Sequence, residues 1–365
     1  MRLVLLALFL GGCSTDFTVL TYNAGLAVGF VPGAEGRAEG TAGATVAVDA
    51  DLVCLQEVWQ ADHVALFEAA ADGVYGDSYF PEPSQRVADS PMCAAEDIEP
   101  LTTCMNESCG DVCADELPTC LLENCALKFL SLEKLCMECV QANVGDTADG
   151  IQATCTAGGT HYAYDGSFGT GLLSKFPLRE VEERVFDSTT NRRSVLHAVA
   201  EAPGGDVDVY CTHLSAVFSV IPYPREEGSW AEEQATQISE LLAFVDESGD
   251  PDGRNMILGD LNTGPAVGDS VAEVPDNWAL LAASGMTAPY VDAAGVCTFC
   301  PDNPLNSADS DADGVVIDHV LLGGGLQGVD TARVLDEEIT VEGCAGEVPG
   351  AHSDHYGLTV DVDKR

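Results

Sequence analysis

Carboxylate, amide and imidazole side chains recur at the ends of short apolar runs in this sequence. They are Asn23, Glu57, His213, Asp260, Asn262, Asp318, Asp354 and His355. Carboxylate and amide oxygens bind hard divalent cations, and a histidine beside a carboxylate takes a proton from water. Each residue alone is more often a turn cap or a structural group. Together, these residue types predict metal-assisted hydrolysis.

The apolar runs that precede these residues have the length of buried β-strands. The expected strands cover 17–22, 51–57, 171–177, 194–200, 207–212, 255–258 and 315–322. The clearest helix is 232–245, where Ile238, Leu241 and Val245 fall on one stripe. Strands that alternate with helices predict an α/β fold, and such a sheet builds its site at the strand ends.

The composition excludes several classes of protein. The 365 residues include 60 Asp and Glu against 15 Lys and Arg, a formal charge of −45. This excludes a basic module that wraps nucleic-acid phosphates. Hydrophobic residues make up 46% of the chain, which is enough for a core and excludes general disorder. The length allows one large α/β domain.

The first residues have the pattern of an export signal. The chain begins Met1-Arg2, and an apolar run over 3–10 leads to Gly11-Gly12-Cys13. This run is shorter than the ~20 residues that span a bilayer, so we expect a signal peptide over 1–12. Its end resembles a bacterial lipobox, which predicts lipidation of Cys13 and a place at the outer membrane or cell surface. The alternatives are an ordinary cleaved signal and a buried strand.

Nine of the fifteen cysteines lie in the segment 93–155. We interpret this segment as a largely helical insertion held by disulfides, because export permits them. A zinc site is the alternative, since Cys136 and Cys139 have the spacing of zinc ligands. Nine is odd, so one cysteine pairs outside the segment or stays free. The pairing and any protein partner of the insertion remain open.

Three further motifs lie outside this segment. Cys54 and Cys211 fall in apolar strand runs, which is typical of plain buried thiols. Cys297 and Cys300 have redox or zinc spacing, but in an exported chain we expect a small structural disulfide. The acidic run from Asp309 to Asp313 resembles the start of an EF-hand and is a weak site for a structural Ca²⁺. Its twelfth position lacks the required glutamate, so a solvated acidic turn is the default.

Six motifs, in this order, resemble the endonuclease/exonuclease/phosphatase superfamily with its DNase I-like fold. They are Thr21-Tyr-Asn23, Leu55-Gln-Glu57, Thr212-His-Leu214, Gly259-Asp-Leu-Asn262, Ile317-Asp-His319 and Ser353-Asp-His355. The resemblance spans 17 to about 362, so we expect one domain over 13–365 that the insertion at 93–155 interrupts. It implies a four-layer α/β sandwich, with two sheets packed face to face and helices outside.

The resemblance also implies a metal site. Glu57 would bind a divalent metal, Mg²⁺ or Mn²⁺, with Asn23 close to it and Asp354 as a second contact. A hard cation suits these oxygen ligands, whereas zinc prefers histidine or thiolate. The reaction it implies is hydrolysis of a phosphoester by in-line attack of water.

The remaining motif residues would carry the proton transfers. The resemblance makes His355 the general base, oriented by Asp318. Asp260 and Asn262 would position the nucleophile and a phosphoryl oxygen. His213 would stabilise the pentacoordinate phosphate or protonate the leaving group. Two such histidines predict a bell-shaped pH profile near neutrality.

The substrate class is less well determined. Abasic-site endonucleases of this superfamily usually have tyrosine where this chain has His213, whereas nucleases and sphingomyelinases have histidine. The motifs around Glu57, His213 and His355 look closest to the sphingomyelinase branch, although its long hydrophobic hairpin is not evident. Arg193, in the only adjacent arginine pair, is a weak candidate for a contact to substrate phosphate. A solvated strand edge is the alternative for that pair.

We therefore expect an exported, lipid-anchored, metal-dependent phosphodiesterase. Its substrate would be a lipid head group or small phosphodiester, with DNA as the alternative that makes the chain a secreted endonuclease. An alternative of another class is a catalytically silent binding protein on the same fold. The presence of every expected catalytic residue type argues against that alternative.

Overall fold

A computed structural model describes residues 17–112, 116–143, 145–250, 253–309, 313–343 and 346–364. The strands are β1 (Phe17–Asn23), β2 (Leu52–Gln56), β3 (Asp77–Tyr79), β4 (Gly171–Ser174), β5 (Leu178–Val185), β6 (Ser194–Ala200), β7 (Val207–His213), β8 (Arg254–Asp260), β9 (Asp318–Leu322), β10 (Leu326–Val334), β11 (Ile339–Gly343), β12 (Gly346–Gly350) and β13 (Gly357–Lys364). The helices are α1 (Ala34–Ala47), α2 (Ala61–Ala71), α3 (Ala95–Ser108), α4 (Leu117–Asn124), α5 (Ala126–Phe129), α6 (Lys134–Ala142), α7 (Ala148–Ala157), α8 (Trp230–Ser248), α9 (Pro275–Ala282) and α10 (Pro289–Asp292).

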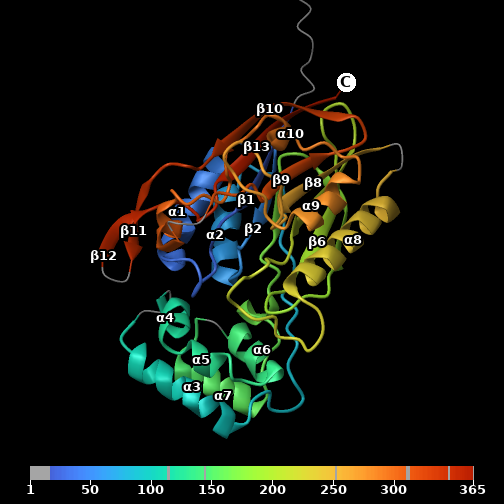
Figure 1. The fold of residues 1–365 in the computed structure, drawn as a ribbon. Helices are drawn as coiled ribbons and strands as arrows, with labels where there is room; N and C mark the ends of the chain where they lie inside the picture. The colour runs from blue at the N-terminus through green and yellow to red at the C-terminus, as the bar shows by residue number, and fades with distance from the viewer. Residues whose placement is uncertain are drawn as a thin grey trace, which may run out of the picture.

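The body has four layers. Two sheets pack face to face, one in the order β10-β13-β1-β2-β4-β3 and the other in the order β5-β6-β7-β8-β9. Helices α1 and α2 cover the outer face of the first sheet, and α8 and α9 cover that of the second (Figure 1). One apolar core fills the space between the sheets, and a further core lies under each helical layer. The predicted four-layer α/β sandwich is confirmed.

Local sequence explains most of these elements. Strands β2, β6 and β7 are buried along their whole length, as runs rich in apolar residues should be in the middle of a sandwich. The N-cap of α8 is Ser229, whose hydroxyl accepts a hydrogen bond from the Glu232 amide. Strands β5 and β10 lack the apolar runs from which the other strands were expected, because both are charged strands at the sheet edges.

A disulfide between Cys54 and Cys211 crosses the sandwich core. It joins β2 of one sheet to β7 of the other, with the two Cα atoms 5.4 Å apart. The expectation of two plain buried thiols is therefore wrong. Each cysteine lies on the inner face of its strand, but the sequence of either strand contains nothing about its partner in the opposite sheet. Cys297 and Cys300 form the predicted small disulfide.

The cysteine-rich segment folds as a helical unit beyond one end of the sandwich (Figure 1). Helices α3 to α7 surround an apolar core of their own. Four disulfides between described residues hold them together: Cys93–Cys136, Cys104–Cys125, Cys109–Cys120 and Cys139–Cys155. Because Cys136 and Cys139 are both in disulfides, they do not form the alternative zinc site. The ninth cysteine of the segment, Cys113, lies outside the described residues.

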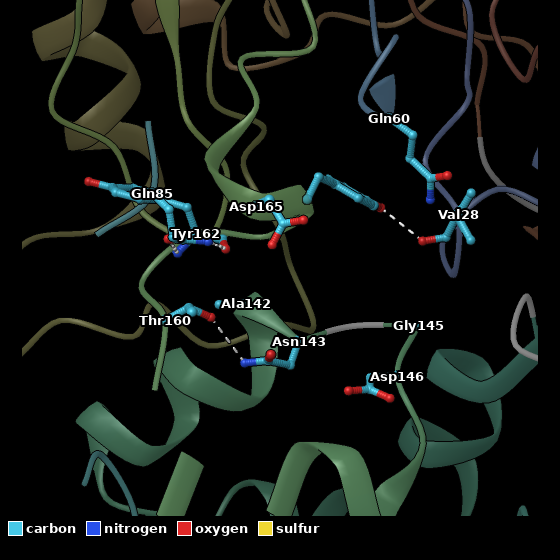
Figure 2. Close-up of a pocket in the computed structure, with 11 residues that line it drawn as sticks. Val28, Gln60, Gln85, Ala142, Asn143, Gly145, Asp146, Thr160, Tyr162 and Asp165 are labelled. Carbon is cyan, nitrogen blue, oxygen red and sulfur yellow. Dashed lines mark hydrogen bonds between the residues drawn. The ribbon is translucent and has the colours of Figure 1, made fainter. Parts of the chain in front are cut away.

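A polar pocket of about 340 Å³ separates this helical unit from the body (Figure 2). On the body side the Tyr164 hydroxyl donates a 3.0 Å hydrogen bond to the Val28 carbonyl. On the insertion side the Asn143 amide lies 3.3 Å from the Thr160 hydroxyl. The space between the helical unit and the body is therefore lined mainly by polar groups on this side, and no continuous apolar interface fills it.

Two sequence predictions fall outside the described residues. One is the signal peptide over 1–12 with lipidation at Cys13, and the other is the calcium site, since 310–312 lie in the middle of its acidic run. Within the described part of the chain, none of the helices combines the length and apolarity that crossing a bilayer requires.

Candidate active site

Strand pairing brings the predicted residues to one edge of the sandwich. Asn23 ends β1, and Glu57 directly follows β2, which runs parallel to β1. His213 ends β7 and Asp260 ends β8, and these strands are also parallel. Asp318 begins β9, which is antiparallel to β8, so its register places it opposite Asp260. Residues up to 295 positions apart in sequence thus meet at one edge because strand directions require it.

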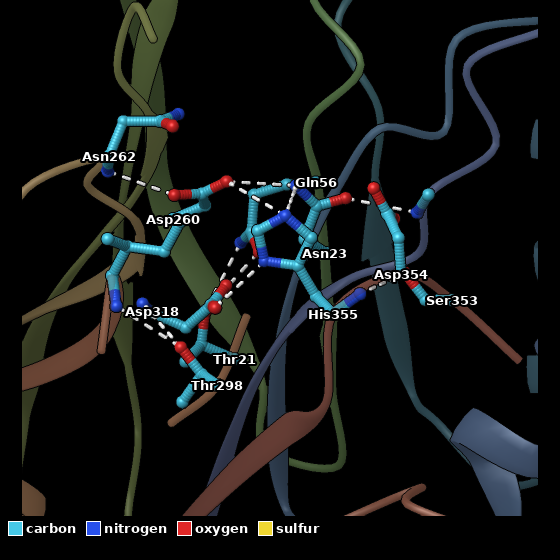
Figure 3. A network of polar contacts seen from close by, with 12 residues as sticks. Thr21, Asn23, Gln56, Asp260, Asn262, Thr298, Asp318, Ser353, Asp354 and His355 are labelled. Atoms are coloured by element: carbon cyan, nitrogen blue, oxygen red, sulfur yellow. Dashed lines mark hydrogen bonds and ion pairs between the residues drawn. The ribbon is translucent and has the colours of Figure 1, made fainter. Parts of the chain in front are cut away.

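His355 lies at the centre of the polar network in Figure 3. Its Nδ1 is 2.9 Å from Asp318 Oδ2, and its Nε2 is 3.4 Å from Asn23 Nδ2. Because the Asp318 carboxylate accepts from Nδ1–H, the neutral ring has its lone pair on Nε2. Asn23 Nδ2 also donates to Asp260 Oδ2 over 2.9 Å. This arrangement presents a proton acceptor, Nε2, beside a buried carboxylate.

The short loop between Cys297 and Cys300 contacts both His355 and Asp318. The sequence did not indicate these contacts. The Thr298 hydroxyl accepts hydrogen bonds from the amides of Ile317 and Asp318 over 3.1 and 3.2 Å. The Phe299 ring lies 5.0 Å from the His355 ring. The disulfide therefore closes a loop whose two central residues contact both members of the pair. The Cys-x-x-Cys spacing was the available signal, but it does not say which residues the loop contacts.

His213 lies on the other side of Asp260. Its Nε2 is 3.3 Å from Asp260 Oδ2 and 3.2 Å from Asn262 Nδ2. The backbone amide of Asn262 donates a 2.9 Å hydrogen bond to Asp260 Oδ1, and this bond holds the carboxylate in place. His213 Nδ1 is buried and has no hydrogen-bond partner among the described residues.

The two histidines have opposite electrostatic surroundings. Burial and the charge of Arg193 lower the pKa of His213 to about 4. Burial would also lower the pKa of His355, but the charges of Asp318 and Asp260 outweigh it and raise that pKa well above 6.5. The expected bell-shaped profile from two histidines near neutrality is therefore not supported, because His213 is neutral there.

Oxygen ligands gather beside His355 in a way that fits a divalent cation. Burial and the charge of Asp354 raise the pKa of Glu57 to about 7, so the ionised carboxylates repel one another. Gly25 approaches them so closely that a Cβ there would lie 2.3 Å from Asp354 Oδ1. The Gly25 amide donates to Asn23 Oδ1 over 3.0 Å. A hard cation would relieve the repulsion, and the donor set of carboxylate and amide oxygens suits one.

Arg193 adds one positive charge to this acidic site. Its side chain is buried, its guanidinium lies 5.5 Å from the Trp59 ring, and its Nη1 has no hydrogen-bond partner among the described residues. Arg192 points elsewhere, donating to the Ser84 carbonyl over 2.8 Å and lying over the Tyr162 ring. The adjacent pair therefore divides: Arg193 faces the site, and Arg192 holds a surface loop.

These groups line a cleft of about 530 Å³. Its catalytic-edge lining comprises Glu57, Arg193, His213, Asp260, Asn262, Asp354 and His355. The opposite wall is formed by the loop over 215–221, with Gln141 from the insertion. The volume is that of a small-molecule site.

The family assignment rests on the whole chain as well as on this cleft. The model of the Endonuclease/Exonuclease/phosphatase family matches residues 20–355. The chain belongs to this family. Among curated proteins, none matches the chain by sequence.

Similar solved structures include three bacterial-type family relatives of nearly full coverage. Sphingomyelinase C from Streptomyces griseocarneus has a TM-score of 0.59 and 18% identity, covering 95% of this chain and 99% of its own. SmcL has a TM-score of 0.60 and 13% identity over 95% and 99% of the two chains. A Staphylococcus aureus beta toxin variant with bound magnesium ions has a TM-score of 0.58 and 14% identity over 96% and 100%. At these identities the similarity shows a shared fold, and it includes the sphingomyelinases that the motifs resemble.

For this family member, sequence reasoning named the titratable groups and missed their supports. Trp59 stacks on Tyr164 with ring centroids 5.1 Å apart and lies beside His213. Buried Glu233 accepts hydrogen bonds from the hydroxyls of Thr189 and Ser215, which line the cleft. No sequence pattern marks such supporting residues, because their position follows from packing between distant segments.

Proposed function

We propose that this family member is a divalent-metal-dependent phosphodiesterase that hydrolyses its substrate by in-line attack of water. Family membership supports a phosphoric diester hydrolase. The observation that carries the proposal is the His355–Asp318 pair, which occupies Nδ1 of His355 and directs its Nε2 toward Asn23 and Asp260, where it can accept a proton from water.

The residues divide the reaction among them. His355 Nε2 takes a proton from the attacking water, and Asp318 stabilises the imidazolium that forms. Asp260 and Asn23 hold the water in line with the phosphorus. Neutral His213 donates a hydrogen bond to a phosphoryl oxygen rather than a full proton. Arg193, whose Nη1 lacks a partner among the described residues, binds a second phosphoryl oxygen.

Glu57, Asp354 and Asn23 would hold the metal, Mg²⁺ or Mn²⁺. When bound, the ion would neutralise phosphate charge and stabilise the leaving oxygen. The raised pKa of Glu57 is consistent with this role, because a carboxylate that burial and the charge of Asp354 destabilise gains most from a nearby cation.

A zwitterionic lipid head group or a small phosphodiester is the proposed substrate class, ahead of DNA. Arg193 is the only Lys or Arg among the described residues that line the cleft, so there is no basic patch there to bind the further phosphates of a polyanion. The sphingomyelinases among the similar structures favour the same class. Nicking of DNA remains the alternative, as in a DNase I-like endonuclease.

We further propose export and anchoring through a lipid on Cys13. The six disulfides among the described residues support an oxidising compartment. The intact mass of the protein from its native membrane tests the anchor, since lipidation would remove residues 1–12 and add acyl mass.

The central test is hydrolysis by the chain from Ser14 onward, with Mg²⁺ or EDTA. The substrates are sphingomyelin vesicles, plasmid DNA and bis(p-nitrophenyl) phosphate, and the variants are His355→Ala and the matched control His352→Ala. His352 contacts Glu337 outside the cleft, so its loss should leave turnover unchanged. Phosphocholine release that needs metal and His355 supports the proposal, and nicked plasmid alone selects the nuclease. The absence of His355-dependent turnover on all three would overturn it in favour of a silent binding protein.

A further inference from the structure

A second, apolar pocket lies where the insertion faces the body. Its volume is about 180 Å³. Its lining includes Leu117, Leu121, Phe129 and Val140 of the insertion, with Phe30 and Ile221 of the body. None of the residues that line it is charged, in a chain where 21% of residues are charged. A lining of this composition binds hydrocarbon in preference to any polar group.

This pocket adjoins the catalytic cleft. Phe30, Gln141 and Ile221 line both spaces. A molecule whose phosphate lies beside Arg193 and His213 would therefore reach the apolar pocket by passing Phe30 and Ile221. The polar pocket of Figure 2 offers no such path, since it shares no lining residue with the cleft.

Helix α6 holds the apolar pocket in a constant position relative to the cleft. Gln141 Nε2 donates to the Pro222 carbonyl over 3.2 Å, and its Oε1 accepts from the Thr190 hydroxyl over 3.0 Å. Lys134 Nζ donates to the Tyr223 carbonyl over 2.6 Å. These bonds join the insertion to both cleft-lining loops of the body. They also satisfy both polar atoms of the Gln141 side chain, so this residue does not require a polar ligand in the pocket.

Exposed apolar side chains also line the cleft itself. Phe30 is 38% exposed, Phe218 39% and Val220 71%, and all three line the cleft. Isolated exposed apolar residues are ordinary, but a group that borders a catalytic cleft beside an apolar pocket indicates an apolar ligand.

We propose that the pocket binds the apolar chain of an amphiphilic phosphodiester whose phosphate lies in the cleft. The inference rests on the proposed function and deepens it by naming the part of the substrate that the insertion recognises. The occupant is a segment of one chain, because the pocket is smaller than the ~300–1,000 Å³ typical of sites that enclose a whole ligand. The insertion thus selects the substrate, while the body hydrolyses it.

The test compares phosphocholine esters of methyl, hexyl and dodecyl alcohol, each below the concentration at which it aggregates. Each methylene buried in the pocket should raise kcat/KM about fourfold, so the burial of about three to four methylenes should place the dodecyl ester on the order of 100-fold above the methyl ester. Thr119→Trp fills the pocket from an exposed position and should remove most of this preference without changing methyl-ester turnover. The matched control is Leu127→Trp, which adds the same ring at an 83% exposed insertion residue outside the pocket and should retain the preference.

A binding measurement and a body-side variant make the result independent of turnover and of insertion folding. Titration calorimetry of dodecyl phosphocholine with His355→Ala should show binding that Thr119→Trp, added to it, weakens at least tenfold. Ile221→Asp should weaken it as well. Turnover of bis(p-nitrophenyl) phosphate with no chain-length preference, or a preference unchanged by Thr119→Trp, would overturn the pocket assignment and leave the proposed function standing. No His355-dependent turnover of any ester would overturn both.

Discussion

The body and the insertion are built and used differently. The body buries large apolar cores between and beside its two sheets, and strand ends present its charged groups to the cleft. The insertion has an apolar core of its own, tied together by four disulfides among the described residues, and of those residues only Gln141 lines the cleft. A helical unit of this size is only marginally stable by burial, and covalent links add to its stability. The proposed function and the proposed apolar pocket assign chemistry and substrate selection to these two units.

The sharpest test of this division is loss of the base in the body. His355→Ala should lower kcat/KM roughly 10³-fold, because water activation loses its proton acceptor. Turnover is measured on bis(p-nitrophenyl) phosphate, with far-UV circular dichroism to show that the fold persists. A loss below tenfold in a folded protein would remove His355 from the reaction.

The next largest effect concerns the carboxylate behind that base. Asp318→Asn should lower kcat/KM roughly 10²-fold and move the acidic limb of the pH profile to lower pH. The sign follows from the raised pKa of His355: the base is active when neutral, and removing a negative neighbour lowers the pH at which it deprotonates. A pH–rate profile of the variant checks this. If the acidic limb of the variant lies at the same pH as that of the wild type, a group other than His355 titrates there.

A smaller effect is expected from the disulfide loop of the body. The double variant Cys297→Ser with Cys300→Ser should lower kcat about tenfold, because Thr298 and Phe299 then position Asp318 and His355 less well. Since the loop spans only three residues in sequence, the melting temperature should change little. If kcat is unchanged, the loop is structural only.

The smallest effect on chemistry should come from the insertion. Cys104→Ser with Cys125→Ser opens a link of 21 residues and should destabilise the insertion by about 3 kcal/mol. Hydrogen exchange should report lost protection in α3 to α5, with β6 to β8 unaffected. Turnover of bis(p-nitrophenyl) phosphate should stay within twofold of the wild type. A large loss would show that the insertion supports catalysis as well as substrate selection.

Much of the fold was accessible from local patterns. Buried strands such as β6 and β7 are short runs rich in apolar residues, and α8 has both an apolar stripe and a serine cap. The charged edge strands β5 and β10 could not be predicted from local patterns, since an edge strand needs only part of its surface buried. The pairing of Cys54 with Cys211 was also missed, because it depends on how two sheets face each other.

The sequence by itself determined which residue types are available to the site, because residue type decides what can bind a cation or accept a proton. It placed Asn23, Glu57 and His213 at strand ends, where strand direction brings them together. Asp318 was expected inside a strand over 315–322, but the strand begins at Asp318 itself. Only the tertiary structure decided the electrostatic character of these groups. His213 and His355 are the same residue type, yet burial lowers one pKa to about 4 and neighbouring carboxylates raise the other. A pKa depends on the charges and solvent around a group in space, and distant segments supply both.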